Sequence, residues 1–487
     1  MIELKIDLNK RRQTRLIVLT EVKEGLLIES TTSAKVHVSV RVISPQGELV
    51  GEIIHGHWKF PTVIQIDNRG STINANPVTL SDGAYRFDVF LMKTEESEAT
   101  ESTPYVKLTI KTGSTPRLLG LAYHIKPSET WDNSVADVME SISDGNAKYY
   151  RGDLHGHTTF SDGNLMPNEA VSLIDDIGLD YMALTEHNRM AFGYPNGKAL
   201  LIPSFELTLP RGHMNLIGTN LPLHADIVEE LTSADSIMDS LRRVLAASGT
   251  ICSINHPFLK PWDYSLPHVN ISDVDTLEII CDPTYPDSPL ANQRAVAFLD
   301  WLWESGYKLF GVGGSDAHNR LDDWYEGADR PSVYGDPSTY VFCDGLTVKN
   351  LKQGLRNGNI YVSRGLNLEI QIDGGKQLPG NKVQESISSY VIAIDWKRAS
   401  ELSGHVIGKF IYCGRVIQEE VLSVDSQVFS LKTPVEFREG TEWLRAGFYD
   451  LNGNVIGYVN PVYSSKRPLR DGDVLTLIKR FEKESSQ

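Results

Sequence analysis

The chain has 487 residues, of which 41% are hydrophobic and 23% charged, and its formal net charge at pH 7 is −16. This composition is that of a globular protein and excludes collagen-like, disordered and membrane-spanning chains. The acidity argues against a general nucleic-acid binder, which would carry a basic stripe, and the length predicts about three domains.

Residues 1–118 are predicted to form a β-sandwich. Runs of alternating apolar and polar residues recur at 36–43, 85–91 and 105–110, and turn-forming clusters such as SPQGE and LSDGA separate them. Strands at this spacing are typical of two packed sheets. The stretch 119–148 is predicted to be a linker, whose helix at 128–142 follows a capping Ser or Asp.

Residues 149–365 repeat a different pattern three times: a helix, a glycine, a short apolar strand and a polar cluster. The helices are predicted at 167–177, 233–247 and 291–305, and the clusters are TEH, NHP and GSDAH. Apolar strands that alternate with helices predict a buried parallel sheet. In such folds the carboxyl ends of the strands carry the chemistry, so one barrel mouth would explain why His or Asp stands there each time.

The segment 366–487 returns to alternating patterns, such as LNLEIQID and WLRAGFYD, and is predicted to be a second β-sandwich with a terminal helix in DVLTLIKRFEKESSQ. The four cysteines lie far apart without a CxxC pair, which predicts no disulfide framework and fits a reduced cytoplasm. The first residues carry charges and no small-residue cleavage site, so no secretory signal is expected. No run approaches the roughly 20 apolar residues of a membrane-spanning helix.

A set of histidines and acids is predicted to bind metal ions. In the extended HGH segment the imidazoles of His155 and His157 would face the same way, and Gly156 would let the backbone approach closely. The full set of candidates is His155, His157, Asp162, His187, Glu206, His213, His256, Asp316 and His318. Mixed imidazole and carboxylate ligands suit Zn, Mn or Fe rather than Ca or a thiolate-bound metal.

With these residues in view, the middle region resembles the PHP (polymerase and histidinol phosphatase) family of metal-dependent hydrolases, through HGHTTFSDG, TEHN, NHP and GSDAH. The GHMN segment and the C-terminal WLRAGFYDLNGNVIGYVNPVY resemble the carbamate-hydrolase (CehA/McbA) branch. The resemblance implies an α/β fold with a distorted seven-stranded β/α (TIM-like) barrel and two or three divalent ions. The ligands it implies are His155, His157, Glu206 and Asp316 for the first ion, the shared Glu206 with His213 and His256 for the second, and Asp162, His187 and His318 for the third.

Such a centre predicts hydrolysis. Two ions bridged by a carboxylate would share a water and lower its pKa, and the resulting hydroxide would attack while the ions stabilise charge on the substrate. Glu206, Asp316 and His318 are the predicted catalytic residues, and no GxSxG or GxxxxGK[ST] signature is present. Three divalent ions would leave a double positive charge after three carboxylates and a hydroxide are counted, which complements a phosphomonoester dianion. With two ions a single charge would remain, which suits a neutral carbamate or ester.

The sequence therefore predicts a phosphoesterase that acts on a small phosphorylated molecule, with no partner of nucleic acid or membrane. Cations that follow the ligands, Arg189, Lys260 and Arg320, and the more distant Arg364 are predicted to bind phosphate. One alternative is a carbamate or carboxylic ester hydrolase of the CehA/McbA type. The other is a non-catalytic binding protein with a relic barrel, against which stands the retention of all nine candidate ligands. The sequence identifies no general acid and leaves the oligomeric state open.

Overall fold

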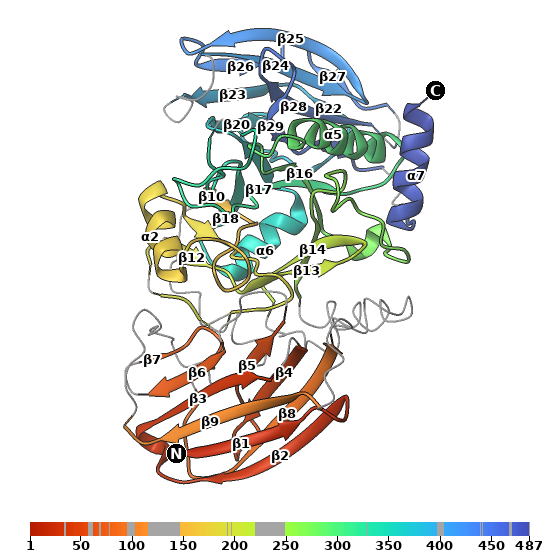
Figure 1. Cartoon of the computed structure of the whole chain (residues 1–487). Coiled ribbons are helices and arrows are strands. Elements are labelled where there is room, and N and C mark those ends of the chain that lie inside the picture. The colour runs from red at the N-terminus through yellow and green to blue at the C-terminus, as the bar shows by residue number, and fades with distance from the viewer. Residues whose placement is uncertain are drawn as a thin grey trace.

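A computed structural model describes the chain except for residues 34–35, 57–61, 68–69, 77, 95–102, 115–146, 192, 196, 220–248, 329, 397–403, 439, 441, 467–469 and 487. The described part is a mixed α/β structure that is rich in strands and has few helices. The strands nearest the N-terminus form one end of the molecule and those nearest the C-terminus form the other, with the middle of the chain between them (Figure 1).

The N-terminal strands form two sheets that share one core. The first sheet runs in the order β1 (Ile2–Asp7), β9 (Tyr105–Thr112), β3 (Gly25–Thr32), β6 (Val63–Asp67) and β7 (Gly70–Ser71), with a 3-10 turn, η1 (Val22–Glu24), before β3. The second runs β2 (Arg12–Leu19), β8 (Gly83–Thr94), β4 (Val36–Ile43) and β5 (Leu49–His55). Alternate residues of β4, Val38, Val40 and Val42, are buried in the shared core, as the period of two requires.

The strands of the middle region divide between two further sheets. One contains β13 (Ser204–Leu209), β14 (Gly212–Ile217), β15 (Ile251–Ile254), β16 (Thr276–Cys281) and β17 (Phe310–Gly314). The other runs β12 (Leu200–Leu201), β11 (Tyr181–Met182), β10 (Ala147–Asp153), β18 (Ser338–Asp344) and β19 (Ile360–Ser363). Pairing is parallel along β15–β16–β17 and along β10–β11–β12, but antiparallel at the β13–β14 hairpin and between β10 and β18.

The expected seven-stranded barrel is not closed by the paired strands of the described residues. Strand β11 supplies only two residues of ladder, and β18 carries its sheet onward through β19 into the C-terminal strands instead of back toward β17. Two isolated bridges join the two sheets, one between His187 and Glu206 and one between Gly156 and Ala317. The prediction of a closed barrel is therefore wrong for this part of the chain, although both sheets meet at the predicted ligands.

The predicted helix boundaries can be compared directly with the helices of the structure. The helix predicted at 167–177 is confirmed as α2 (Pro167–Ile177), which Glu169 caps by accepting from the Met166 backbone N–H and which ends at Gly178 with φ of 71°. The helix predicted at 291–305 is α5 (Ser288–Glu304), and the terminal helix is α7 (Val474–Ser485). A further helix, α6 (Val348–Asn357), precedes β19, and a 3-10 turn, η3 (Ile271–Asp273), precedes β16. The helices predicted at 128–142 and 233–247 lie outside the described residues.

The C-terminal strands extend the sheet of β10 and pack against smaller sheets. The extension continues from β19 through β29 (Val455–Val459), β28 (Trp443–Tyr449), β24 (His405–Tyr412) and β25 (Arg415–Ser423). Strand β30 (Val462–Ser464) also pairs with β28, and β21 (Lys382–Val383) pairs with β30. The smaller sheets are β20 (Asn367–Ile372), β23 (Tyr390–Asp395) and β26 (Val428–Ser430), and the pair β22 (Ser386–Ile387) and β27 (Val435–Glu436). Phe410, Phe448 and Phe429 fill the core between them.

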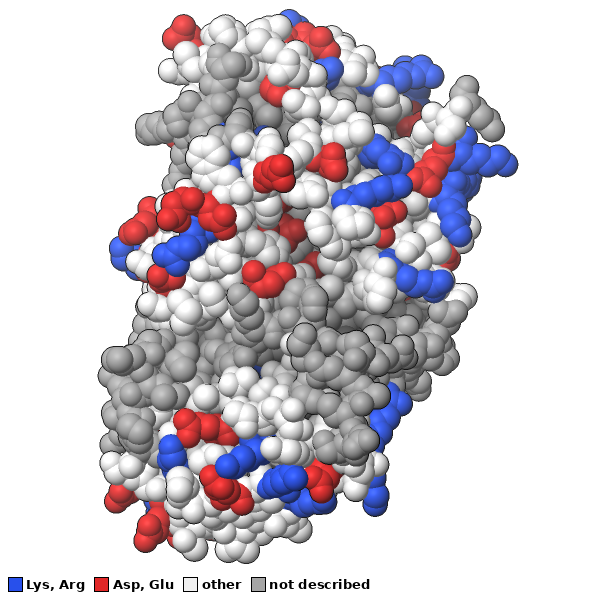
Figure 2. Space-filling model, in the orientation of Figure 1, with Lys and Arg blue, Asp and Glu red and all other residues white. Residues whose placement is uncertain are grey.

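Charged side chains of both signs are interspersed on the face drawn in Figure 2, where the described Lys and Arg residues form no continuous stripe. Within the described residues, the helices are all too short or too polar to cross a bilayer.

Candidate metal centre

The nine predicted ligands converge because each lies in the β13–β14 hairpin or in a loop that follows the carboxyl end of a strand. Backbone hydrogen bonds fix the two most distant loops to each other: the Asp316 N–H donates to the His155 carbonyl at 3.0 Å, and the His157 N–H donates to the Ala317 carbonyl at 3.0 Å. A Cβ at Gly156 would lie 2.9 Å from the ring of Tyr334 as well as 2.6 Å from Met182 Cε, so glycine fits this position without displacing them.

Backbone strain is concentrated at the same strand ends. His256 after β15, Asp282 after β16 and Asp316 after β17 all have positive φ values, of 25°, 31° and 49°. Such conformations are costly for residues other than glycine and cluster at functional sites, where the surrounding structure holds them. Three successive strands therefore turn sharply where they deliver side chains to the cluster.

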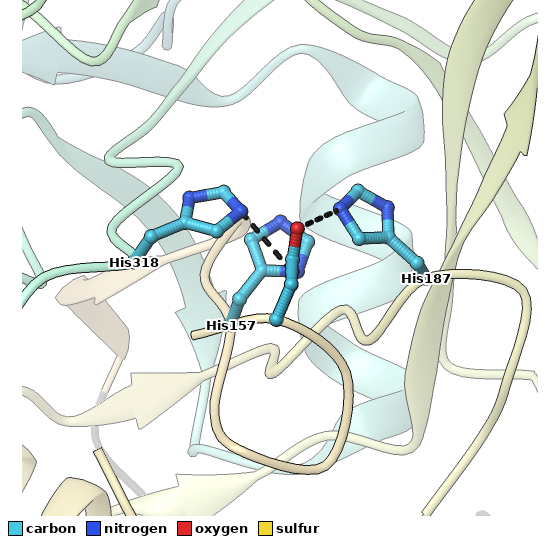
Figure 3. Close-up of side chains that lie close together, drawn as sticks. His157, His187 and His318 are labelled. Carbon is cyan, nitrogen blue, oxygen red and sulfur yellow. Dashed lines mark ion pairs between the residues drawn. The ribbon is translucent and has the colours of Figure 1, made fainter. Parts of the chain in front are cut away.

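Three of the predicted histidine ligands surround the carboxylate of Asp162, itself a predicted ligand. Figure 3 shows the rings of His157, His187 and His318 directed toward one another, and the dashed ion pairs join His187 Nε2 to Asp162 Oδ2 at 3.2 Å and His318 Nε2 to Asp162 Oδ1 at 3.3 Å. The ring of His157 stacks on both neighbours, with centroids 4.5 Å from His187 and 4.2 Å from His318. Burial, with these two histidines, lowers the pKa of His157 to about 3, so its ring is neutral, as a metal ligand must be.

The carboxylate of Glu206 lies at the centre of the cluster, within 3.6 Å of five imidazoles. The contacts are with His187 Nδ1 at 2.8 Å, His213 Nδ1 at 3.0 Å, His155 Nε2 at 3.5 Å, and His157 Nε2 and His256 Nε2 at 3.6 Å. Burial alone would raise the pKa of Glu206, but the histidines around it hold that pKa well below its usual range. An ionised carboxylate among five ring nitrogens can bridge more than one cation.

Asp316 forms a second bridge between ligands. Its Oδ1 lies 3.0 Å from His157 Nε2, 3.1 Å from His155 Nε2 and 3.7 Å from His318 Nδ1. Burial raises the pKa of Asp316, but the neighbouring histidines outweigh it and leave that pKa below its usual range. Glu206 and Asp316, the two acids predicted for the first ion, thus both contact several imidazoles.

The donor set fits divalent cations. The structure gathers four overlapping groups in which the ligand atoms lie within 4.8 Å of one another: His157, Asp162, His187 and His318; His155, His157 and Glu206; Glu206, His213 and His256; and His155, Cys281 and Asp316. Within the described chain, the buried Nε2 of His155 and Nδ1 of His157 have no hydrogen-bond partner. Buried polar atoms are rarely left in this state, and a bound cation would satisfy both.

Sequence reasoning missed the residues that hold the ligands in place. Glu278 in β16 contacts His155 Nδ1 at 2.9 Å and accepts from the His256 N–H at 2.8 Å. Asn255 donates to Glu206 Oε1 at 2.8 Å. The available signal for Glu278 was a single charge inside the apolar run TLEIIC, and for Asn255 its place beside a ligand in NHP.

The loop that carries Asp162 is fixed by the buried Glu186. This carboxylate accepts from Ser161 Oγ at 2.5 Å and from Thr158 Oγ1 at 2.6 Å, and burial raises the pKa of Glu186 to about 7. The buried carboxylate of Asp153 fixes further ligand-bearing loops. It accepts hydrogen bonds from the backbone N–H groups of His155, Ser315 and Gly335.

The four predicted phosphate-binding cations are placed differently from the ligands. Arg364 forms a bidentate pair with Asp336 at 2.8 and 2.9 Å, and the half-exposed Arg320 pairs with Glu169 at 3.0 Å. Arg189 is buried and donates to the Glu52 carbonyl of the N-terminal region at 2.6 Å. Lys260 is exposed and forms no ion pair with the described residues. Three of the four are thus already engaged by other parts of the protein.

No family model matches the sequence, and no curated protein matches it. Comparison with solved structures finds a two-domain protein from Bacteroides vulgatus that contains a predicted PHP-like metal-dependent phosphoesterase, 16% identical, with a TM-score of 0.34 over 66% of this chain and 97% of that one. A second is a provisionally assigned metal-dependent phosphoesterase from Bifidobacterium adolescentis, 16% identical, with a TM-score of 0.25 over 42% of this chain and 95% of that one.

A third similar structure is an amidohydrolase from Chromobacterium violaceum, 15% identical, with a TM-score of 0.24 over 35% of this chain and 89% of that one. Likenesses at these identities and TM-scores establish no family and no activity for this chain. The chemistry of the donor set is what bears on its function.

Proposed function

We propose that this protein is a metal-dependent hydrolase and that its substrates are phosphoesters, either monoesters or diesters. The observation that supports the proposal is the buried carboxylate of Glu206 among five imidazoles, with Asp316 and Asp162 each joined to further histidines. This arrangement offers overlapping donor groups for two or three divalent ions, of which Zn, Mn and Fe suit the mixed ligands.

The residues of the chain would act by holding and orienting charge. When bound, divalent ions would lower the pKa of a water molecule and stabilise negative charge on the substrate. Glu206 and Asp316, kept ionised by their neighbours, would hold adjacent ions together, while Glu278 and Asn255 fix His155 and Glu206. His318 would stand at the edge of this arrangement, because its side chain is more exposed than those of His155 and His157.

The additional donor group around Asp162 favours phosphoesters. Three divalent ions would bring six positive charges, of which Glu206, Asp316 and Asp162 would neutralise three. The remaining positive charge complements a phosphate dianion better than a neutral substrate.

A carbamate or carboxylic ester hydrolase is the second candidate. It is favoured by the engagement of Arg189, Arg320 and Arg364 with other groups, which leaves few cations to clamp a phosphate. A non-catalytic binding role is disfavoured, because all nine candidate ligands are retained and gathered in one cluster.

A substrate panel with a shared leaving group separates these candidates. Nitrophenyl phosphate, bis(nitrophenyl) phosphate, a nitrophenyl carbamate and nitrophenyl acetate all release nitrophenol, so their rates differ only through the group attacked. We expect the metal-loaded protein to cleave the phosphate esters fastest, to lose activity with a chelator and to regain it with Zn, Mn or Fe. Preference for the carbamate or acetate would select the second candidate. Purified protein that holds no metal after supplementation would contradict both.

A further inference from the structure

A buried thiol, Cys281, lies beside the metal cluster, although no sequence motif points to it as a ligand. Cys281 is the last residue of β16, is 1% exposed, and has its Sγ 3.9 Å from Asp316 Oδ2. The Sγ, a ring nitrogen of His155 and an oxygen of Asp316 all lie within 4.8 Å of one another.

An irregularity in β16 explains why this side chain faces the cluster. Residues three apart in a regular strand point to opposite faces, so Glu278 and Cys281 should not share a side. The pairing of β16 with β17 shifts register between Glu278 and Ile280, as at a β-bulge. Because of this shift, side chains on both sides of it face the cluster. Glu278, before the shift, contacts His155 Nδ1 at 2.9 Å, and Cys281, after it, has its Sγ 3.9 Å from Asp316 Oδ2. Bulges re-aim side chains in this way beside functional sites.

A second observation points from the same place to a cation. The Nε2 of His155 is fully buried and, within the described chain, has no hydrogen-bond partner, although Asp316 Oδ1 is 3.1 Å away. Glu278 occupies the other ring nitrogen, so Nε2 faces the carboxylate of Asp316, whose second oxygen is the one that Cys281 contacts. A carboxylate behind the ring is the usual way in which a protein orients a histidine ligand.

We infer that Cys281 is a metal ligand and that it binds, as a thiolate, an ion held with His155 and Asp316. This inference rests on the proposed metal centre and adds a sulfur ligand to it. Tetrahedral zinc, with Zn–N of about 2.0 Å and Zn–S of about 2.3 Å, places such ligand atoms roughly 3.3–3.5 Å apart. The separations here are 3.1 Å from His155 Nε2 to Asp316 Oδ1 and 3.9 Å from Cys281 Sγ to Asp316 Oδ2, so small side-chain shifts would bring the three ligands onto one ion. On binding, the thiol gives its proton to solvent and the sulfur takes up the metal.

The sulfur ligand would also set the choice of metal. Thiolates favour Zn, Fe and Co over Mg and Mn, whereas the histidine and carboxylate groups elsewhere in the cluster accept either kind. The position beside Cys281 would therefore bind Zn, Fe or Co more tightly than Mn.

Cobalt(II) reports on this bond without any activity measurement. Titration of the full-length, metal-free protein should produce a near-ultraviolet sulfur-to-cobalt charge-transfer band, as well as visible d–d bands from cobalt on histidine and carboxylate ligands. Cys281→Ser should lose the charge-transfer band and keep most of the visible bands. Cys252→Ser is the matched control, because Cys252 is an equally buried thiol on the neighbouring strand β15, and this variant should keep both.

The wild-type spectrum alone can overturn the inference, so the test does not depend on how the variants fold. Bound cobalt without a charge-transfer band would refute ligation by Cys281 and leave the proposed function standing. A band that persists in Cys281→Ser would also refute it. Failure of the protein to bind cobalt at all would overturn the inference and the proposed function together.

Discussion

At the scale of single residues, Glu278 shows how the cluster is held. It contacts the ring of His155 on the side away from the other ligands and also accepts from the backbone of His256. One buried carboxylate therefore positions two ligands that belong to different donor groups. Supporting acids of this kind usually matter almost as much as the ligands themselves.

Replacement of this acid should weaken metal binding without unfolding the protein. We expect Glu278→Gln to reduce metal affinity by about 10- to 100-fold, as measured by competition with a chromogenic chelator, because the amide orients His155 less firmly. Asp275→Asn is the control, since Asp275 lies just before β16 but pairs with Arg356 and the Cys252 N–H, outside the cluster. Equal affinities in the two variants would show that Glu278 does not support the centre.

At the scale of the elements, several ligands could be predicted because they follow helix and strand boundaries that the sequence pattern indicates. The helix–glycine–strand pattern placed His187, His256 and Asp316 at strand ends, and parallel strands bring such ends to one edge. Glu278 and Cys281 could not be placed in the same way, because the register shift in β16 breaks the alternation from which facing is inferred.

Other features could not be predicted because they depend on contacts between residues far apart in the sequence. The barrel was expected to close, but the antiparallel pairing of β10 with β18 directs that sheet toward the C-terminal strands. Arg364 forms an ion pair with Asp336, and Arg189 donates to the carbonyl of Glu52. No local sequence pattern predicts either contact.

The packing of β17 against the first ligand loop gives a test at this scale. A Cβ on Gly314, the last residue of β17, would lie 2.4 Å from His155 Cβ and 2.5 Å from Glu278 Oε1. We expect Gly314→Ala to displace this pair, to cost about 1–3 kcal/mol of stability and to reduce the number of ions bound. Thermal unfolding and elemental analysis would measure both effects.

Gly472→Ala provides the comparison for that substitution. Its added Cβ would meet Tyr307 at 3.4 Å, an ordinary contact. We expect its metal content to match that of the unmodified protein. Full metal content in Gly314→Ala as well would mean that the close approach of β17 to His155 is not needed for binding.

At the scale of the whole molecule, the N-terminal sheets contact the metal-binding region directly. Arg189, two residues after the ligand His187, donates to the Glu52 carbonyl of β5 at 2.6 Å. Its guanidinium also lies 4.6 Å from the ring of Phe160, in the loop that carries Asp162. Ile73 packs in the same apolar cluster as Phe160. A ligand loop is therefore supported from one side by a separate part of the chain.

This contact should couple the N-terminal sheets to the ion beside Asp162. Arg189→Met removes a buried, charged hydrogen bond worth about 1.5–3 kcal/mol, and we expect both a lower unfolding temperature and selective loss of one bound ion. Arg320→Met is the matched control, because Arg320 also stands two residues after a ligand, His318, but its solvent-exposed pair with Glu169 contributes little to stability. Calorimetry and metal analysis of the full-length variants would distinguish them. If Arg189→Met kept every ion while its unfolding temperature fell, the N-terminal sheets would stabilise the fold without shaping the metal centre.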